Sequence, residues 1–94
     1  MTISDEAAVR RRKIAFRAWH RGTREMDLIM GRFADAELAK LDDAGLDSFE
    51  ALMEQADPDL YKWVSGEAAV PPEVDAAFLA RIRTFHTTTG ALRG

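Results

Sequence analysis

Residues 20–33 read HRGTREMDLIMGRF, and this stretch decides the fold. Its apolar residues recur at the spacing of one face of an α-helix, at Met26, Ile29, Met30 and Phe33. Gly22 stands just before this stripe, among charged residues. A glycine so placed is typical of a boundary between helices, where it ends one helix in a left-handed conformation or caps the next. The stretch therefore predicts two helices joined by a short turn at Gly22.

The helices around this turn have recognisable limits in the sequence. The first is expected to run from about Ser4, a residue suited to the N-cap, to His20. The second is expected over residues 23–40. Asp42 or Asp43 then caps a third helix. Helical spacing predicts that its inward-facing residues are Leu46, Phe49, Leu52 and Met53.

A fourth helix is marked at both ends by residues 57–66, DPDLYKWVSG. Asp57 suits the N-cap, and Pro58 suits the first helical position because its missing N–H is not needed there. Gly66 suits the position just past the C-terminal end. The spacing predicts that this helix buries Leu60, Trp63 and Val64.

The pattern restarts once more near the C-terminus. Pro72 is expected near the first position of a fifth helix. Its apolar stripe comprises Val74, Phe78, Ile82 and Phe85. Residues 87–94 show no such pattern and are expected to form a frayed tail.

These elements predict an all-α fold, a compact bundle of about five short helices. We expect one domain over residues 1–94, with its core at about 5–86 and a flexible tail at 87–94. Hydrophobic residues make up 47% and charged residues 31%, an ordinary globular balance. The absence of cysteine excludes disulfides, thiolate metal sites and cysteine nucleophiles. No apolar run approaches the roughly 20 residues that span a bilayer, so no membrane insertion is expected.

Charge is unevenly distributed along the chain. Residues 1–24 carry seven bases and two acids, residues 25–75 carry fourteen acids and three bases, and residues 76–94 carry three bases and no acid. The basic N-terminal segment has some character of a mitochondrial presequence, but Asp5 and Glu6 precede it and it runs directly into the turn. We therefore interpret it as part of the fold and expect a cytoplasmic protein.

No residue constellation indicates an enzyme, and no catalytic residue is assigned. The two histidines, His20 and His86, are far apart and lack metal-binding spacing, so no metal site is predicted. No glycine-rich phosphate loop is present, so tight binding of a nucleotide cofactor is not expected. The net charge of −3 disfavours a nucleic-acid partner, although bases and aromatics mix near the N-terminus.

Two readings of the turn remain open from the residues alone. In the first, the turn has a purely structural role. Gly22 is the boundary between the helices, and Glu25 at the third helical position reaches back to a free backbone N–H. Arg21 and Arg24 beside them are not explained in this way. A surface that another protein recognises is the alternative.

Four short motifs together resemble the succinate dehydrogenase assembly factor 2 family, also called FAD assembly factors. The resemblance covers roughly residues 12–86. In order along the chain, the motifs are Arg21-Gly22-x-x-Glu25-x-Asp27, then Arg32-Phe33-Ala34, then Asp59-x-Tyr61-x-Trp63, then the proline-rich start of the last helix. A single Arg-Gly-x-x-Glu is a weak signal, whereas four motifs in order at family-like spacing are specific.

The resemblance implies a small five-helix factor that promotes covalent attachment of FAD to the flavoprotein subunit of succinate dehydrogenase. It implies that fumarate reductase flavoprotein is a further client, that FAD belongs to the client and not to the factor, and that the factor is a chaperone. We expect it to be a monomer. The partner-binding residues that the resemblance implies are Arg21, Gly22 and Glu25, with Arg24 and Asp27 as neighbours.

Further contact candidates are Arg17, His20, Tyr61 and Trp63. Helical spacing with Leu60 and Val64 favours a core position for Trp63 over a surface contact. Two other functions remain as alternatives. One is a general interaction or antitoxin-like regulatory module with no effect on flavin, and the other is a carrier that holds FAD itself.

Overall fold

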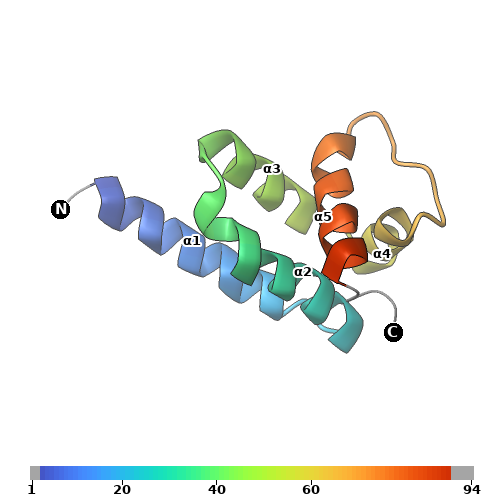
Figure 1. The fold of residues 1–94 in the computed structure, drawn as a ribbon, viewed down its shortest axis with the longest axis horizontal. Helices are drawn as coiled ribbons and strands as arrows, with labels where there is room; N and C mark the ends of the chain where they lie inside the picture. Colours follow the sequence, from blue (N-terminus) through green and yellow to red (C-terminus); the bar gives the residue numbers. More distant parts are fainter. Residues whose placement is uncertain (1–2, 90–94) are drawn as a thin grey trace.

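The computed structural model describes residues 3–89, and the surroundings of side chains from residue 6 to residue 88. Within that range the regular secondary structure is entirely helical, with no strand, as the sequence predicts. The elements are α1 (Ile3–Trp19), α2 (Arg24–Glu37), the short 3-10 helix η1 (Leu38–Lys40), α3 (Asp43–Met53), α4 (Asp57–Ser65) and α5 (Ala76–Thr89). Figure 1 shows α1 and α2 side by side as a helical hairpin, with α3 along it and α5 crossing the bundle.

The end of α1 approaches α2 closely at one position. Gly31 of α2 lies under the indole of Trp19, where an added β-carbon would clash with the ring. The indole Nε1 donates a hydrogen bond to Asp35 Oδ1 at 3.1 Å. A glycine at this position therefore lets the tryptophan at the end of α1 lie flat on α2, about two turns past the α1–α2 connection.

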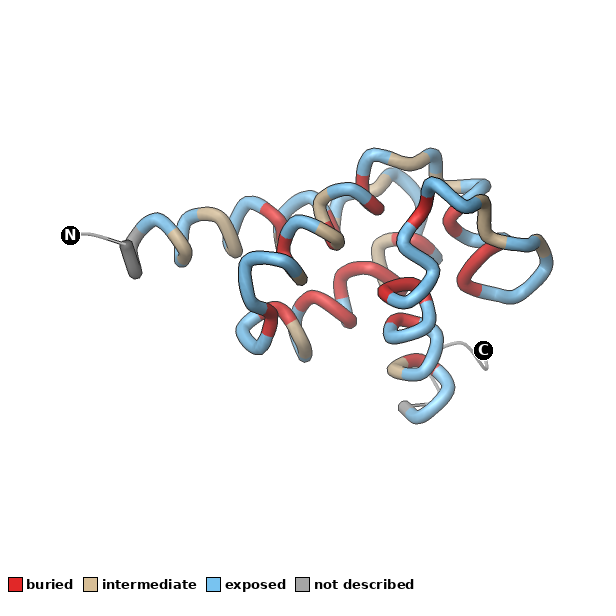
Figure 2. The backbone as a smooth tube through the Cα atoms, turned by 90° about the horizontal axis from the view of Figure 1, so that it is seen from above, coloured by how far each residue is buried: buried red, intermediate tan, exposed pale blue. Residues whose placement is uncertain are grey.

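The core is built around Phe33. Its ring meets the rings of Phe49, Phe78 and Phe85 edge-on, with centroids 5.6–5.7 Å apart. Edge-to-face contact is a favourable arrangement of aromatic rings. The predicted stripe of α2 is confirmed, since Met26, Ile29, Met30 and Phe33 are all buried. Figure 2 shows the buried positions gathered between the helices, while residues 6–13 of α1 extend outward and bury little.

In α1 and α2, two helix limits differ from the expectation. α1 begins at Ile3, so Ser4 lies inside the helix and is not its N-cap. α2 ends at Glu37, and the last residues of the expected helix form η1 instead. Arg11 of α1 explains the second difference, because its guanidinium donates to the carbonyls of Leu38 at 3.1 Å and Leu41 at 2.7 Å. A distant arginine thus satisfies carbonyls that a continued α-helix would have used.

The N-cap of α3 makes a side-chain hydrogen bond to its helix, whereas the N-cap of α4 does not. Asp42 caps α3, with its carboxylate accepting from Gly45 N at 2.9 Å, and the predicted inward residues are buried. The prediction for α4 is wrong at its start, because Ala56 is the N-cap and gives no side-chain hydrogen bond. Asp57 is therefore the first helical residue, and its carboxylate accepts a hydrogen bond from Arg21 instead of capping the helix. Gly66 ends α4 in the left-handed region at φ 85°, as expected.

α5 also starts later than the sequence indicates. Its first residue is Ala76 rather than a position near Pro72, because Asp75 caps it by accepting from Phe78 N at 3.0 Å. This hydrogen bond, followed by one from Ser48, lowers the pKa of Asp75. At the other end the helix continues to Thr89, so the first residues of the expected tail are helical. Residues 90–94 lie outside the described range.

His86 is fully buried on α5, a position that the predicted stripe did not include. Its ring Nε2 lies 2.7 Å from the carbonyl oxygen of Ile29 and donates to it. Burial lowers the pKa of His86, the Ile29 carbonyl opposes this shift, and the charge of Arg32 adds to it. The imidazole is therefore neutral in the fold at pH 7.

We expect this histidine to make the fold sensitive to mild acid. Its pKa is lower in the fold than in the unfolded chain, so its contribution is complete above about pH 6.5 and is lost as pH falls toward the folded pKa. The loss should reach at most about 1.4 kcal/mol per pH unit. Urea unfolding from pH 7.5 to 5.0 measures it. His86→Gln should flatten this dependence and His20→Gln, at an exposed histidine, should keep it; equal slopes in both variants would contradict the assignment.

Among residues 3–89, no helix is both long and apolar enough to cross a membrane.

Candidate functional site

The turn between α1 and α2 is short and fixed by its backbone. Gly22 has φ 116°, a conformation that side chains rarely adopt, which agrees with its predicted place at the end of the first helix. The N-cap of α2 is Thr23, whose Oγ1 accepts from Met26 N at 3.3 Å. Glu25 is thus the second helical residue, and its predicted capping contact from the third position is wrong. Its side chain is left exposed.

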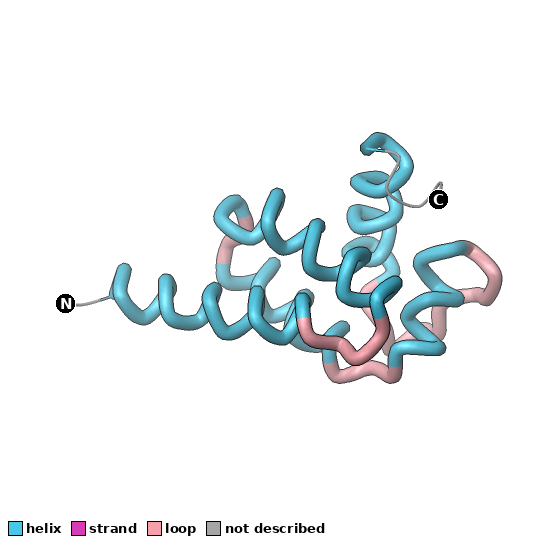
Figure 3. Tube along the Cα trace, turned by 90° about the horizontal axis from the view of Figure 1, so that it is seen from below, coloured by secondary structure: helices cyan, strands magenta, loops and turns pink. Residues whose placement is uncertain are grey.

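Arg21 points into the protein rather than out of it. Its Nε donates to Asp57 Oδ1 at 2.8 Å, and its two terminal nitrogens donate to the carbonyls of Met53 at 2.7 Å and Gln55 at 2.9 Å. The side chain is 11% exposed. Figure 3 shows that the α1–α2 turn lies beside the α3–α4 connection, which supplies these acceptors. Arg21 therefore ties the two connections together.

Asp27 holds the same turn from the side of α2. Its Oδ1 accepts from the backbone N–H of Arg21 at 2.5 Å and from that of Gly22 at 3.3 Å. These two donors would otherwise have no helical partner. Arg21 and Asp27 together fix the conformation of the turn from inside.

The outer edge of the turn consists of Gly22, Arg24 and Glu25, all exposed. A β-carbon placed on Gly22 would meet no heavy atom within 4 Å, so the surface is open there. The predicted site thus divides into an inner pair, Arg21 and Asp27, and this outer edge. Another protein can approach the backbone at Gly22 closely, with a positive and a negative side chain available beside it.

The other predicted contacts lie at different depths. Arg17 is paired with Glu54 at 2.6 Å, and both side chains are exposed. His20 is exposed and stacks on Phe16, with ring centroids 4.0 Å apart, and its Nδ1 donates to the Phe16 carbonyl at 2.6 Å. Phe16 itself is 64% exposed and was not among the predicted contacts. Its place on the outer face of an amphipathic helix was the available signal.

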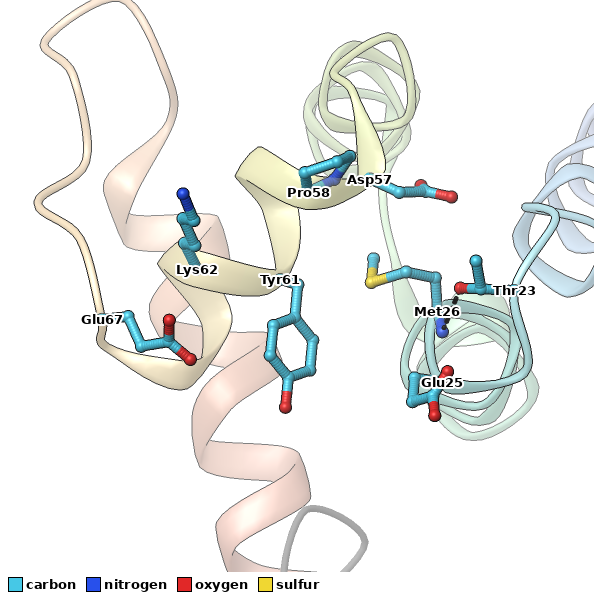
Figure 4. Close-up of a pocket in the computed structure, with 8 residues that line it drawn as sticks. All are labelled: Thr23, Glu25, Met26, Asp57, Pro58, Tyr61, Lys62 and Glu67. Atoms are coloured by element: carbon cyan, nitrogen blue, oxygen red, sulfur yellow. Dashed lines mark hydrogen bonds between the residues drawn. The ribbon is translucent and has the colours of Figure 1, made fainter.

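The two aromatic residues of α4 differ in exposure. Trp63 is only 8% exposed and belongs to the core, as its spacing predicts. Tyr61 is 40% exposed. Figure 4 shows it facing Met26 and Glu25 of α2 across a hollow. The helix therefore uses Trp63 to anchor itself and presents Tyr61 beside the turn.

Hollows flank the turn on both sides. One, of about 500 Å³, lies between the start of α2 and α4, with Thr23, Glu25 and Met26 on one wall and Pro58 and Tyr61 on the other. We call it the α2–α4 groove.

The second hollow, of about 580 Å³, lies on the other side of Gly22, between the end of α1 and the start of α2. Trp19, His20, Arg24 and Leu28 contribute to its lining. The Gly22 edge thus stands between two concave surfaces, an arrangement suited to protein docking. Among the described residues, no three potential ligands come close enough to hold a metal ion.

Known proteins place this chain among assembly factors. A family model described as "Flavinator of succinate dehydrogenase" matches residues 12–86, which includes every motif noted above. The chain belongs to this family.

Related proteins carry names in keeping with this family. The chain is 37% identical over 78 residues to the FAD assembly factor SdhE of Acetobacter pasteurianus, covering 83% of this chain and 72% of that protein. It is 33% identical over 73 residues to the mitochondrial succinate dehydrogenase assembly factor 2 of Dictyostelium discoideum, covering 78% of this chain and 52% of that protein. No solved structure matches the chain at a significant level.

The chain spans most of the FAD assembly factor of Acetobacter, about half of the assembly factor of Dictyostelium, and 38% of the assembly factor of Arabidopsis thaliana. Residues 12–86, which the family model matches, contain the turn, Arg21 with its hydrogen-bond acceptors and all of α4. The assignment of individual partner-binding residues stays a prediction.

Proposed function

We propose that this protein binds the flavoprotein subunit of succinate dehydrogenase and promotes covalent attachment of FAD to it, with Gly22, Arg24 and Glu25 as the docking edge. The observation that carries the proposal is the division of the turn. Arg21 and Asp27 fix it through internal hydrogen bonds, while the outer edge stays exposed between two hollows. A preformed edge loses little conformational entropy on binding.

The proposed mechanism is chaperoning, not catalysis. The factor binds the flavoprotein in the conformation that holds FAD in position for bond formation, and so raises the population of that state. FAD remains the client's cofactor, and the client's own groups form the bond. We further propose a monomer acting in the cytoplasm, with fumarate reductase flavoprotein as a second client.

Covalent flavin in the client is the direct test. The flavoprotein subunit is co-expressed with no factor, with wild type, or with a variant, and in-gel flavin fluorescence is read after denaturation. We expect wild type to raise the signal and Glu25→Ala to lower it several-fold, because a charge-assisted contact at the docking edge is removed. Glu6→Ala changes an exposed glutamate on the distant first turns of α1 and should match wild type.

Substitutions at Gly22 separate bulk from backbone strain. Gly22→Ala places a methyl group in open space, so its effect comes from the positive φ alone, about 1–3 kcal/mol of stability. Gly22→Arg adds a long side chain to the docking edge. Loss of flavin signal in Gly22→Arg but not in Gly22→Ala indicates blocked docking. A flavin signal that never depends on the factor would instead favour an interaction module with another target.

A further inference from the structure

The α2–α4 groove has an apolar floor that no described side chain fills. Figure 4 shows the Tyr61 ring on one wall, Met26 opposite it and Pro58 above, so a gap between hydrophobic surfaces remains open. Tyr61 is one of few large apolar side chains that stand exposed among the described residues. A concave apolar surface beside a docking edge is typical of a pocket for a partner's side chain.

The charges around this floor are mainly negative. Glu25 stands at the α2 rim and Glu67 at the opposite end, where Figure 4 shows it extending toward Tyr61. Asp57 is already paired with Arg21. Lys62 is the one basic lining residue, and it points away from Tyr61. The free charge facing the floor is therefore acidic.

The lining of the groove as a whole has the same sign. It holds three acids, Glu25, Asp57 and Glu67, against the one base Lys62. Such a surface attracts a cationic partner and repels an anionic one. Phosphates and acidic peptides are thus poor occupants, although the docking edge itself also contains a base, Arg24.

We propose that the α2–α4 groove receives a segment of the flavoprotein client that presents an apolar side chain next to a lysine or arginine. The apolar side chain lies between Tyr61 and Met26, and the cation faces Glu25 and Glu67. This inference rests on the proposed function and adds to it the chemistry of the contacted client segment. Glu25 then serves two purposes, as part of the docking edge and as an acidic rim of the groove.

Binding of the purified apo-flavoprotein subunit by interferometry tests the apolar contact. Tyr61→Ala should weaken the Kd roughly tenfold or more, because a central aromatic anchor is removed. Val9→Ala removes an exposed apolar side chain of similar exposure from the outer face of α1 and should stay within about twofold. Since Tyr61 is exposed, both variants should melt close to wild type. Equal Kd values for wild type and Tyr61→Ala would overturn the proposal.

Charge reversal tests the cationic contact. Glu67→Lys should weaken the Kd several-fold, and the loss should shrink at high salt because exposed charges are screened. Glu6→Lys makes the same change on α1, away from the groove, and should have little effect. Tighter binding by Glu67→Lys would overturn the proposal by showing that the client segment is acidic.

The chain has no cysteine, so one introduced thiol can be labelled uniquely. Lys62→Cys carrying a benzophenone maleimide should crosslink to a client peptide that contains a basic residue beside an apolar one, as mapped by mass spectrometry. A crosslink only to a second copy of the factor, or to a client segment without a basic residue, would overturn the inference. If wild type itself fails to bind the flavoprotein, the proposed function is wrong. If wild type binds and the groove variants bind with the same Kd, only the proposal for the groove is wrong.

Discussion

Trp63→Ala is expected to lower the free energy of unfolding by about 3–5 kcal/mol, the usual loss when a buried tryptophan is truncated. Trp63 is 8% exposed and is one of only three buried residues of α4, with Leu60 and Val64. α4 is nine residues long and has no side-chain N-cap, so it depends on these contacts. The expected loss is a large part of the roughly 5–15 kcal/mol that holds a small domain together.

Thermal and urea unfolding measure this effect. Each kcal/mol corresponds to about 4–8 °C in a domain of this size, so the Tm should fall by more than about 10 °C. Tyr61→Ala is the matched control, an aromatic residue of the same helix that is 40% exposed, and it should lose less than about 1 kcal/mol. A Trp63→Ala variant with the same Tm as wild type would mean that the Trp63 side chain does not stabilise the core.

The apolar stripes were predictable because they depend on spacing within single helices. Met26, Ile29, Met30 and Phe33 recur at helical intervals, and a repeat of that kind needs one buried face whatever packs against it. His86 was missed for the opposite reason. A lone histidine carries no periodic signal, and its burial depends on the Ile29 carbonyl that α2 brings to it.

Helix ends were less predictable because distant residues compete for the same groups. Asp57 followed by Pro58 is a sound local signal for an N-cap, yet the carboxylate of Asp57 binds Arg21, which is 36 positions away in sequence. The end of α2 was misplaced for a similar reason, since Arg11 binds the carbonyls beyond it. Capping rules describe the hydrogen bonds that a residue can make with its sequence neighbours. In the folded chain, a partner from a distant part of the sequence can form the hydrogen bond instead.

The candidate site was likewise only partly predictable from the sequence. The backbone role of Gly22 and the place of Glu25 beside the turn follow from the motif. The inward direction of Arg21 does not, because an arginine in a highly charged turn gives no sign that three acceptors lie behind it. The α2–α4 groove could not be predicted from the sequence either, since it exists only where α4 packs beside the start of α2.

Arg21→Ala is expected to lower the free energy of unfolding by about 2–4 kcal/mol, because it leaves a carboxylate and two carbonyls without their donor. The pair is partly reached by water, with Arg21 11% and Asp57 19% exposed, so the loss falls below that of a fully buried pair. Urea unfolding at neutral pH measures it. Arg17→Ala breaks the exposed pair with Glu54 and should change stability by less than about 1 kcal/mol.

Arg21→Lys separates geometry from charge. A lysine keeps the positive charge but cannot direct three N–H groups along one plane, so it should recover only part of the stability. Arg21→Ala and Asp57→Ala, measured singly and together, should show a coupling free energy of about 1–2 kcal/mol. A coupling near zero would mean that the two side chains do not act as a unit. If the coupling is present, Arg21 and Asp57 act as a unit that ties the α1–α2 turn to the start of α4.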